Sequence, residues 1–399
     1  MLNLLNLGNT PKVIDREETI HKEVNSMKKL ALLLSSVLLT FFLIACSESA
    51  TANKESEGND EKPVQEDGTA DKKDKKEEPE KMEEKKPPQP YKPLEPAEDA
   101  TPLKDKVSEE DLEQMPQAES HGEDRTRMVE VGETLVKDAE DQTDGPLKNH
   151  RLVAYYGHPN STNMGILGEL EPEQFMEKLK EQTQAYSDAD PSRPAVPMIE
   201  LISTVAQRDP GPEGKYFHST SPEQIDEYAE LAKKNDALLM LDVQLGTDSV
   251  LDHVKLLEKW LKLPYVHLAI DTEFHVKEGQ TPGIDLGQVD GAEVQEVVDY
   301  LSDMVEENDL PDKIVLVHQF VDDALTNKEA IQPTENVEVA LNYDGWGDGN
   351  TKMSLYRKFV RNEAVQYGGF KIFYKKDEPV LTPEEVLKLD PSPAIINYQ

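Results

Sequence analysis

The stretch Val266–Phe274, with the sequence VHLAIDTEF, is an apolar run that ends with two carboxylates, Asp271 and Glu273. Side chains alternate between faces along an extended chain, so Asp271 and Glu273 share one face of the predicted strand. A strand that is buried on both faces seldom carries two charges unless they lie at its open end, where solvent, a ligand or a metal offsets their desolvation. Such a pair could do acid chemistry, bind a metal, or belong to a structural network of hydrogen bonds.

Glycoside hydrolysis is the first chemistry that this pair predicts. One protonated acid donates to the leaving oxygen, and a second carboxylate acts as nucleophile, base or electrostatic stabiliser. Glu273 is the predicted acid, and Asp271 would orient it and raise its pKa by like-charge coupling. Asp242 or Asp344 would hold or activate the second reactant. We therefore predict that Glu273, Asp271 and Asp242 are catalytic.

Polar residues also end nearly every other predicted strand, where they could bind a substrate. Aromatic residues near the same ends could stack on sugar rings or simply pack at the rim; they are Tyr156, Phe274, Tyr343, Trp346 and Tyr374. Tyr156 and Gln319 would position the sugar. The predicted substrate-binding residues are Tyr156, His158, Glu200, Gln244, His318, Gln319, Asn342, Asp344, Lys371 and Tyr374.

Two alternatives remain open at this stage. The first is metal-assisted hydrolysis, for which the possible ligands are His158, Asp242, Asp271, Glu273 and His318. No His-x-His or His-Glu-x-x-His spacing supports it, so the sequence predicts neither a metal nor a cofactor. The second is a sugar- or wall-binding protein that keeps the rim of polar residues but performs no reaction.

A repeating pattern from Arg151 onward supplies the elements that would position these residues. The strand-like runs are Leu152–Gly157, Val196–Ser203, Ala237–Gln244, Val266–Glu273, Ile314–Gln319, Val337–Tyr343, Phe370–Tyr374 and Ala394–Tyr398. The helix-like runs between them are Pro172–Tyr186, Pro222–Asn235, Ser249–Leu261, Ala292–Glu307, Asp322–Ile331, Lys352–Val365 and Pro383–Leu389. Ser221-Pro222-Glu223 and Thr382-Pro383-Glu384 are typical helix starts.

Eight strands that alternate with helices over roughly 250 residues predict an α/β fold, the (β/α)8 TIM barrel. A doubly wound sheet usually has a glycine-rich phosphate loop, and Gly165-Ile-Leu-Gly168 lacks that spacing. The sequence stops at Gln399, directly after the eighth strand. We expect the segment before Arg151 to replace the final helix or to plug the N-terminal end of the barrel.

The N-terminal region predicts export and a lipid anchor. Met27-Lys28-Lys29 and the apolar run Leu30–Ala45 are typical of a secretory signal and are short for a membrane span. The run ends Leu43-Ile44-Ala45-Cys46, which resembles the lipobox of bacterial lipoproteins and implies acylation of Cys46. The predicted divisions are an upstream extension at 1–26, a signal peptide at 27–45, a disordered tether rich in Glu, Lys and Pro at 46–125, and the barrel at 126–399.

The composition limits the partners. With 80 acidic and 43 basic residues the formal charge is -37, which offers no footprint for nucleic acid. A single cysteine, Cys46, excludes disulfides and thiolate zinc sites within the chain. We expect a monomer on the extracellular face of the cell membrane, with the Cys46 lipid in the membrane and a polysaccharide or cell-wall glycan as ligand.

Two family resemblances extend this interpretation. The ending Asp271-Thr272-Glu273 resembles the fourth strand of chitinase-like and lysozyme-like glycosidase barrels, although Ala269 stands where chitinases have a further Asp, which leaves substrate-assisted retention in doubt. Residues Arg151–Gln399 resemble a group of secreted barrel proteins of Gram-positive bacteria, in which the fourth strand ends Asp-Pro-Glu-Trp. This second resemblance implies the fold and the compartment and leaves the substrate open. Its motifs are Tyr155-Tyr-Gly157, Met164-Gly-Ile-Leu-Gly-Glu169, Leu241-Asp-Val-Gln-Leu-Gly246, His318-Gln-Phe320, Asp344-Gly-Trp-Gly347, Gly369-Phe-Lys-Ile-Phe-Tyr374 and Tyr398-Gln399.

Overall fold

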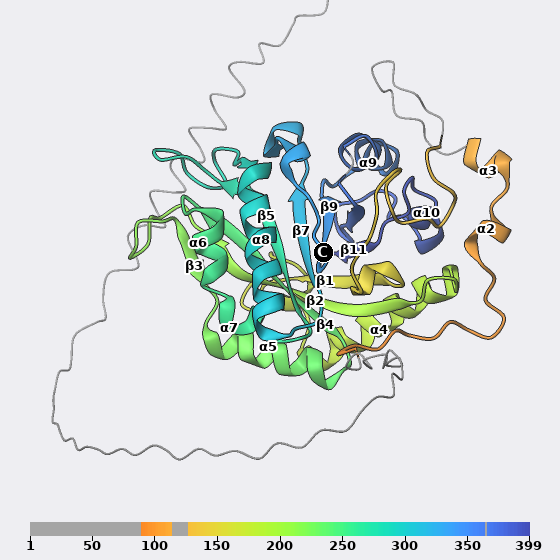
Figure 1. The fold of residues 1–399 in the computed structure, drawn as a ribbon, viewed down its shortest axis with the longest axis horizontal. Helices are drawn as coiled ribbons and strands as arrows, with labels where there is room; N and C mark the ends of the chain where they lie inside the picture. The colour runs from red at the N-terminus through yellow and green to blue at the C-terminus, as the bar shows by residue number, and fades with distance from the viewer. Residues whose placement is uncertain (1–88, 114–126, 364) are drawn as a thin grey trace, which may run out of the picture. The chain divides into compact units, whose positions relative to one another are not determined.

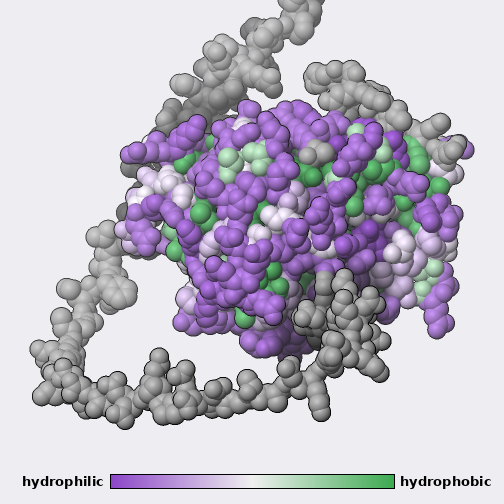
Figure 2. Space-filling view, viewed as in Figure 1, coloured by the Kyte–Doolittle hydropathy of each residue, from purple (hydrophilic) through white to green (hydrophobic). Residues whose placement is uncertain are grey.

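The computed structural model describes residues 89–113, 127–363 and 365–399 (Figure 1). Several predicted features lie outside the described residues: the upstream extension, the signal peptide, the acylation of Cys46 and most of the tether. Within the described residues, no helix combines the length and the apolar character needed to cross a membrane. The face shown in Figure 2 is mostly hydrophilic, with small scattered apolar spots, as expected for a chain of such high net charge.

Eight parallel strands close into a barrel, which confirms the predicted (β/α)8 fold. Neighbouring strands pair in the order β1-β11-β10-β9-β7-β5-β4-β2, and the pairing of β1 with β2 closes the ring. The short strand β3 (Phe217–Ser219) extends β2 in antiparallel fashion. The barrel strands are β1 (Arg151–Gly157), β2 (Ala195–Ala206), β4 (Leu238–Gly246), β5 (Val266–His275), β7 (Lys313–Gln319), β9 (Val337–Tyr343), β10 (Tyr367–Ile372) and β11 (Ile395–Tyr398).

The strand register places polar side chains side by side on the inner wall. Gln244 of β4 pairs with Asp271 of β5, Asp271 pairs with His318 of β7, and His318 pairs with Asn342 of β9. Asn342 in turn pairs with Gly369 of β10, where there is no room for a side chain, because a Cβ there would lie 2.5 Å from the side-chain oxygen of Asn342. Residues that are far apart in the chain thus meet at one height in the barrel.

Helices cover the outside of the barrel where the apolar spacing predicts them (Figure 1). The N-cap Ser221 accepts a hydrogen bond from the backbone N–H of Gln224, and Thr382 and Glu385 form a capping box, which confirms both predicted helix starts. A π-helical turn at Arg357–Arg361 continues α9. The helices around the barrel are α4 (Pro172–Ala189), α5 (Pro222–Lys234), α6 (Val250–Lys255), α7 (Glu258–Leu261), α8 (Gly291–Asn308), α9 (Gly349–Tyr356) and α10 (Pro383–Leu387).

One predicted helix is wrong. Asp322–Ile331 forms two short 3-10 turns, with Leu325–Thr326 (β8) between them in parallel pairing with Val289–Asp290 (β6). Asn327 adopts the left-handed conformation with φ 52°, which interrupts a helix. The backbone of Asn327 also lies so close to the start of α8 that a Cβ on Gly291 would approach its carbonyl oxygen to 2.1 Å. Local packing against α8 therefore replaces a regular helix here.

The segment before β1 covers the N-terminal end of the barrel, the second of the two expected positions. The backbone N–H of Val136 donates to Gln366 O just before β10, and that of Ser392, just before β11, donates to Glu133 O. The buried carboxylate of Glu338, at the start of β9, accepts from the backbone N–H of Leu147 at 3.2 Å. The open end of the barrel is therefore the opposite one, where the strands end.

Residues 89–113, which fall within the predicted tether of 46–125, contact the barrel. The backbone N–H groups of Lys92 and Leu94 donate to Asp236 O at 2.9 Å and to Ala195 O at 2.8 Å. Leu103 in the short helix α2 (Leu103–Lys106) is only 1% exposed. A second short helix, α3 (Glu109–Glu113), follows, and the backbone N–H of Asp111 in it donates to the preceding Ser108 Oγ at 3.1 Å. A few apolar side chains anchor this stretch to the barrel despite its high content of charge and proline.

A buried ion pair fastens the N-terminal end of the barrel, and we expect it to be important for stability. Arg151 Nη1 lies 2.9 Å from Asp190 Oδ2, and Arg151 Nη2 donates to Gly132 O at 2.9 Å. Because Arg151→Ala leaves Asp190 charged and buried without its partner, it should lower the free energy of unfolding by about 3–5 kcal/mol in urea titrations. Lys233→Ala, which breaks an exposed pair with Glu230, should change it little. An equally small effect of Arg151→Ala would contradict this assignment.

Candidate active site in the barrel mouth

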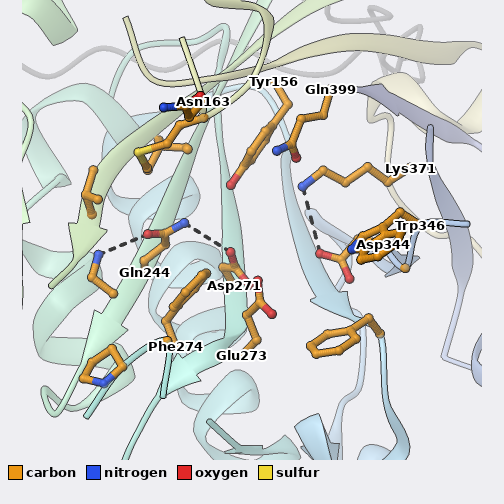
Figure 3. Close-up of a pocket in the computed structure, with 18 of the residues that line it drawn as sticks. Tyr156, Asn163, Gln244, Asp271, Glu273, Phe274, Asp344, Trp346, Lys371 and Gln399 are labelled. Carbon is orange, nitrogen blue, oxygen red and sulfur yellow. Dashed lines mark hydrogen bonds and ion pairs between the residues drawn. The ribbon is translucent and has the colours of Figure 1, made fainter. Parts of the chain in front are cut away.

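A cavity of about 860 Å³ opens at the ends of the barrel strands, where the fold class places active sites (Figure 3). Its lining is polar toward the centre and aromatic toward the rim. The central side chains are Gln244, Asp271, Glu273, Asp344 and Lys371, and the aromatic ones are Tyr156, Phe274, Phe320, Tyr343, Trp346 and Phe373. Four of the five predicted rim aromatics therefore reach the cavity, and Trp346 is 62% exposed.

Asp271 and Glu273 both face the cavity from β5, as the alternation of side chains predicts. Asp271 is 3% exposed; its Oδ2 accepts from Gln244 Nε2 at 3.4 Å, and its Oδ1 has no hydrogen-bond partner. Glu273 is less buried, and its side-chain carboxyl makes no hydrogen bond or ion pair with any described residue. The more accessible of the two acids is thus the one predicted to donate the proton.

Burial shifts the pKa values of both acids upward. Desolvation, followed by the charge of Glu273, raises the pKa of Asp271 well above its ordinary value. Desolvation, followed by the charge of Asp344, raises the pKa of Glu273 to about 7. The predicted cause of the raised pKa of Glu273 is the charge of Asp271, whereas burial and the charge of Asp344 are the main causes in the structure.

Gln244 is held in position by a local irregularity in β2. The register of β2 against β4 shifts between Ile202 and Thr204, which brings Thr204 Oγ1 within 3.2 Å of the donating backbone N–H of Gln244. His253 Nε2 lies 2.7 Å from the same hydroxyl. Gln244 Oε1 accepts from the backbone N–H of Ala206 at 3.1 Å, which leaves Nε2 to face Asp271.

His318 is the hub of a buried network below the cavity. Its Nε2 lies 2.8 Å from Glu200 Oε1, and its Nδ1 lies 3.4 Å from Asp344 Oδ2 and 3.0 Å from the side-chain amide of Asn342. Burial alone would lower the pKa of His318, but the hydrogen bonds to Asp344 and Glu200 outweigh it and raise the pKa well above the ordinary value. His318 is therefore an imidazolium between two acids at neutral pH.

Asp344 has the opposite electrostatic setting from Glu273. Its burial alone would raise its pKa, but the hydrogen bond to His318 and the charge of Lys371 outweigh this and lower it. Lys371 Nζ lies 4.0 Å from Asp344 Oδ2 and 3.5 Å from the ring centroid of Tyr156. Figure 3 shows this pair facing the same cavity as Asp271 and Glu273. Asp344 is thus an ionised carboxylate beside a protonated acid.

Asp242, which the sequence analysis groups with the catalytic residues, lies behind the cavity wall. Its side chain is fully buried, and its Oδ2 accepts from the hydroxyl of Tyr156 at 3.2 Å. Burial raises the pKa of Asp242 to about 7. Tyr156 stands between Asp242 and the cavity, so Asp242 cannot touch a substrate directly. Asp344, the other residue proposed for the second carboxylate, is the one that reaches the cavity.

Three predicted substrate-binding residues lie elsewhere. His158 Nε2 lies 3.1 Å from Thr220 Oγ1 in a loop, and Gln319 donates to the carbonyl of Phe359 at 3.0 Å, in the helical layer. Tyr374 packs in a separate pocket on the outside of the barrel, where its hydroxyl donates to Gln182 at 3.0 Å. Gln319 follows His318 directly and so points to the opposite face of β7.

Several residues of the site are not among the predicted ones. Asn397 of β11 hydrogen-bonds Glu200, and Asn163, Lys376 and Gln399 line the cavity. Lys376 Nζ lies 5.4 Å from the ring centroid of Trp346. Asn397 and Gln399 stand at the end of the eighth strand with the alternation that marks inward positions, a signal that could have identified them.

A possible metal-binding set lies in the buried network. One ligand atom each from Glu200, Asp242 and His318 lie within 4.8 Å of one another. The set shares only Asp242 and His318 with the predicted ligands; it adds Glu200 and does not include His158, Asp271 or Glu273. Both nitrogens of His318 are already engaged in hydrogen bonds, so a metal would have to displace Glu200 or Asp344 to gain a nitrogen ligand. The geometry fits a hydrogen-bonded imidazolium better than a metal centre.

Comparison of the chain with protein-family models and with curated proteins found no match in either set.

The raised pKa of Asp271 predicts a dependence of stability on pH. Above its ordinary pKa of about 4, the folded protein keeps a proton that the unfolded chain releases, and stability falls by about 1.4 kcal/mol per pH unit until the folded pKa is reached. Asp271→Asn removes this loss, so the variant should gain stability over the wild type between about pH 5 and pH 8. Urea titrations across that range measure it.

Asp344→Asn is the matched control for this prediction, because the pKa of Asp344 is lowered and its contribution is present above the ordinary pKa and lost on acidification. This variant should be less stable than the wild type at neutral pH and approach it in acid. If both variants showed the same trend with pH, the proposed difference between the two carboxylates would be wrong.

Proposed function

We propose that the barrel hydrolyses glycosidic bonds, with Glu273 as general acid and Asp344 as the ionised second carboxylate. The observation that carries this proposal is the opposite direction of the two pKa shifts in one cavity: up to about 7 for Glu273 and down for Asp344. Environments that push two carboxylates apart in this way assign the acid and the base or nucleophile of glycosidases.

The reaction follows from these protonation states. Glu273 donates its proton to the glycosidic oxygen as the bond from that oxygen to the anomeric carbon breaks, so the leaving sugar departs as a neutral alcohol. Asp344 stabilises the positive charge that develops on the sugar ring, and water supplies the new hydroxyl while its remaining proton passes to the Glu273 carboxylate, which restores the acid. Lys371 and His318 keep Asp344 ionised, and they act as positioning residues.

The rim supplies surfaces that would hold a sugar chain. Trp346 is the most exposed aromatic side chain at the mouth, and Phe274 lines the same cavity next to Glu273. Aromatic faces stack on the apolar faces of sugar rings, and the side-chain amides of Asn163 and Gln399 can hydrogen-bond hydroxyl groups (Figure 3). These features support an extended polysaccharide over a small metabolite.

The proposed setting is the outer face of a bacterial cell membrane, with the chain anchored by a lipid on Cys46. Support comes from the sequence alone: the signal-like run Leu30–Ala45, the lipobox-like residues before Cys46, and the spacer that follows. A substrate in the cell wall or the surrounding polysaccharide matches this position. A barrel that binds such a glycan without cleaving it is the alternative, and turnover separates the two.

The proposed roles predict a specific loss of activity. Glu273→Gln should lower kcat about 100-fold or more on a cleaved wall or matrix polysaccharide, because an amide cannot donate the proton. Asp344→Asn should have a similar effect, and Glu306→Gln, on the exposed face of α8, should have none. The activity of the three variants is measured on the full chain as the rate at which reducing ends are released from the polysaccharide, and circular dichroism checks that each variant is folded.

The pH profile supplies an independent check. Since Glu273 must be protonated, kcat/KM should fall as pH rises through about 7, the pKa of Glu273 in the free protein. Unchanged turnover in Glu273→Gln would remove Glu273 as the acid. Retention of oligosaccharide with no turnover in the wild type would favour the binding alternative.

A further inference from the structure

The cavity wall around Asp271 and Glu273 accepts hydrogen bonds but has few donors to offer. Among the described residues, Asp271 Oδ1 has no hydrogen-bond partner, and the side-chain carboxyl of Glu273 makes no hydrogen bond or ion pair. The nearby donors are engaged: Gln244 Nε2 faces Asp271 Oδ2 at 3.4 Å, and the hydroxyl of Tyr156 donates to Asp242 at 3.2 Å. Buried acceptors normally find donors, so a ligand is the natural source of those missing here.

The centre of the same wall holds three carboxyl groups and one lysine, Lys371. Of the three acids that line the centre of the cavity, Asp344 is paired with Lys371, which lies 4.0 Å away, and with His318. Neither Asp271 nor Glu273 forms an ion pair with a described residue. At the rim, Arg208 and Asp209 have opposite charges, and Lys376 lies over the Trp346 ring. The place beside Asp271 and Glu273 therefore suits a positively charged donor.

We propose that the sugar bound beside Asp271 and Glu273 carries a free amino group, so that the ligand is a hexosamine glycan lacking N-acetyl groups. This inference rests on the proposed function in taking the ligand to be a glycan. An ammonium group brings three N–H donors and one positive charge to two carboxyls that form no ion pair with a described residue. An N-acetyl group would instead bring a further carbonyl acceptor and a methyl group against two carboxyls.

Proton linkage supports the inference. The carboxyls that face Glu273 are Asp271, Asp242 and Asp344, and the cations that face it are His318 and Lys371. With a pKa of about 7, Glu273 holds a proton at mildly acidic pH in the free protein. An added positive charge lowers the pKa of a neighbouring acid, so an ammonium sugar that contacts Asp271 should release the proton of that carboxyl, while Glu273 keeps the proton that hydrolysis needs; a neutral sugar should release none.

Titration calorimetry of the full chain tests this with three probes: glucosamine tetramer, N-acetylglucosamine tetramer and cellotetraose. At about pH 6, where the amine is charged, the glucosamine tetramer should bind about tenfold tighter than the other two, from one added charge contact. Repeating the titration in buffers of different ionisation enthalpy should show proton release for this probe alone.

Two variants separate the charge contact from general sugar binding. The double substitution Asp271→Asn with Glu273→Gln should bring the three affinities to within about twofold of one another. Trp346→Ala should weaken all three probes together and keep their ratio, because an aromatic ring stacks on each of them.

Equal affinities in the wild type, or binding of none of the three, would overturn the amino-sugar inference. A preference for the glucosamine tetramer with proton release would support it even if no probe were cleaved. That result would locate the failure in the proposed hydrolysis and not in the recognition of the amine.

Discussion

The site depends on a buried imidazolium between two acids. His318 contacts Glu200 at 2.8 Å and Asp344 at 3.4 Å, and without this cation Glu200 would have no ion pair and Asp344 only the one with Lys371 among the described residues. Leaving one member of such a set unpaired in the interior is strongly destabilising. The imidazolium also keeps Asp344 ionised, while Glu273, which has no hydrogen bond to it, keeps a raised pKa. One interaction thus explains both the stability of the acid-rich wall and the difference between its two accessible carboxylates.

Barrel closure brings this set together. Glu200, His318 and Asp344 come from or directly follow strands β2, β7 and β9, and only a closed ring places them around one axis. The N-terminal end is covered by the segment before β1, so the strand ends are the side left open to a ligand. The unusual feature is the depth of polar residues, which continue from the mouth down to the buried Glu200.

Much of this arrangement could be predicted from the sequence. The periodicity of apolar runs gives all eight strands, and alternation along Val266–Phe274 is enough to place Asp271 and Glu273 inside the barrel. The choice between Asp242 and Asp344 could not be made in this way, because it depends on Tyr156 covering one of them. Gln319 was misplaced because β7 is buried on both faces and shows no polar alternation. The missing helix at 322–331 and the ordered stretch at 89–113 depend on tertiary contacts that local composition does not encode.

Carbon-detected NMR titration of the side-chain carboxyls tests the central claim most directly, with Glu273→Gln and Asp344→Asn used to assign the two resonances. The expected results are a pKa of about 7 for Glu273 and a pKa below the ordinary range of an aspartate for Asp344. Two carboxyls that titrate together at the ordinary value of about 4 would contradict it.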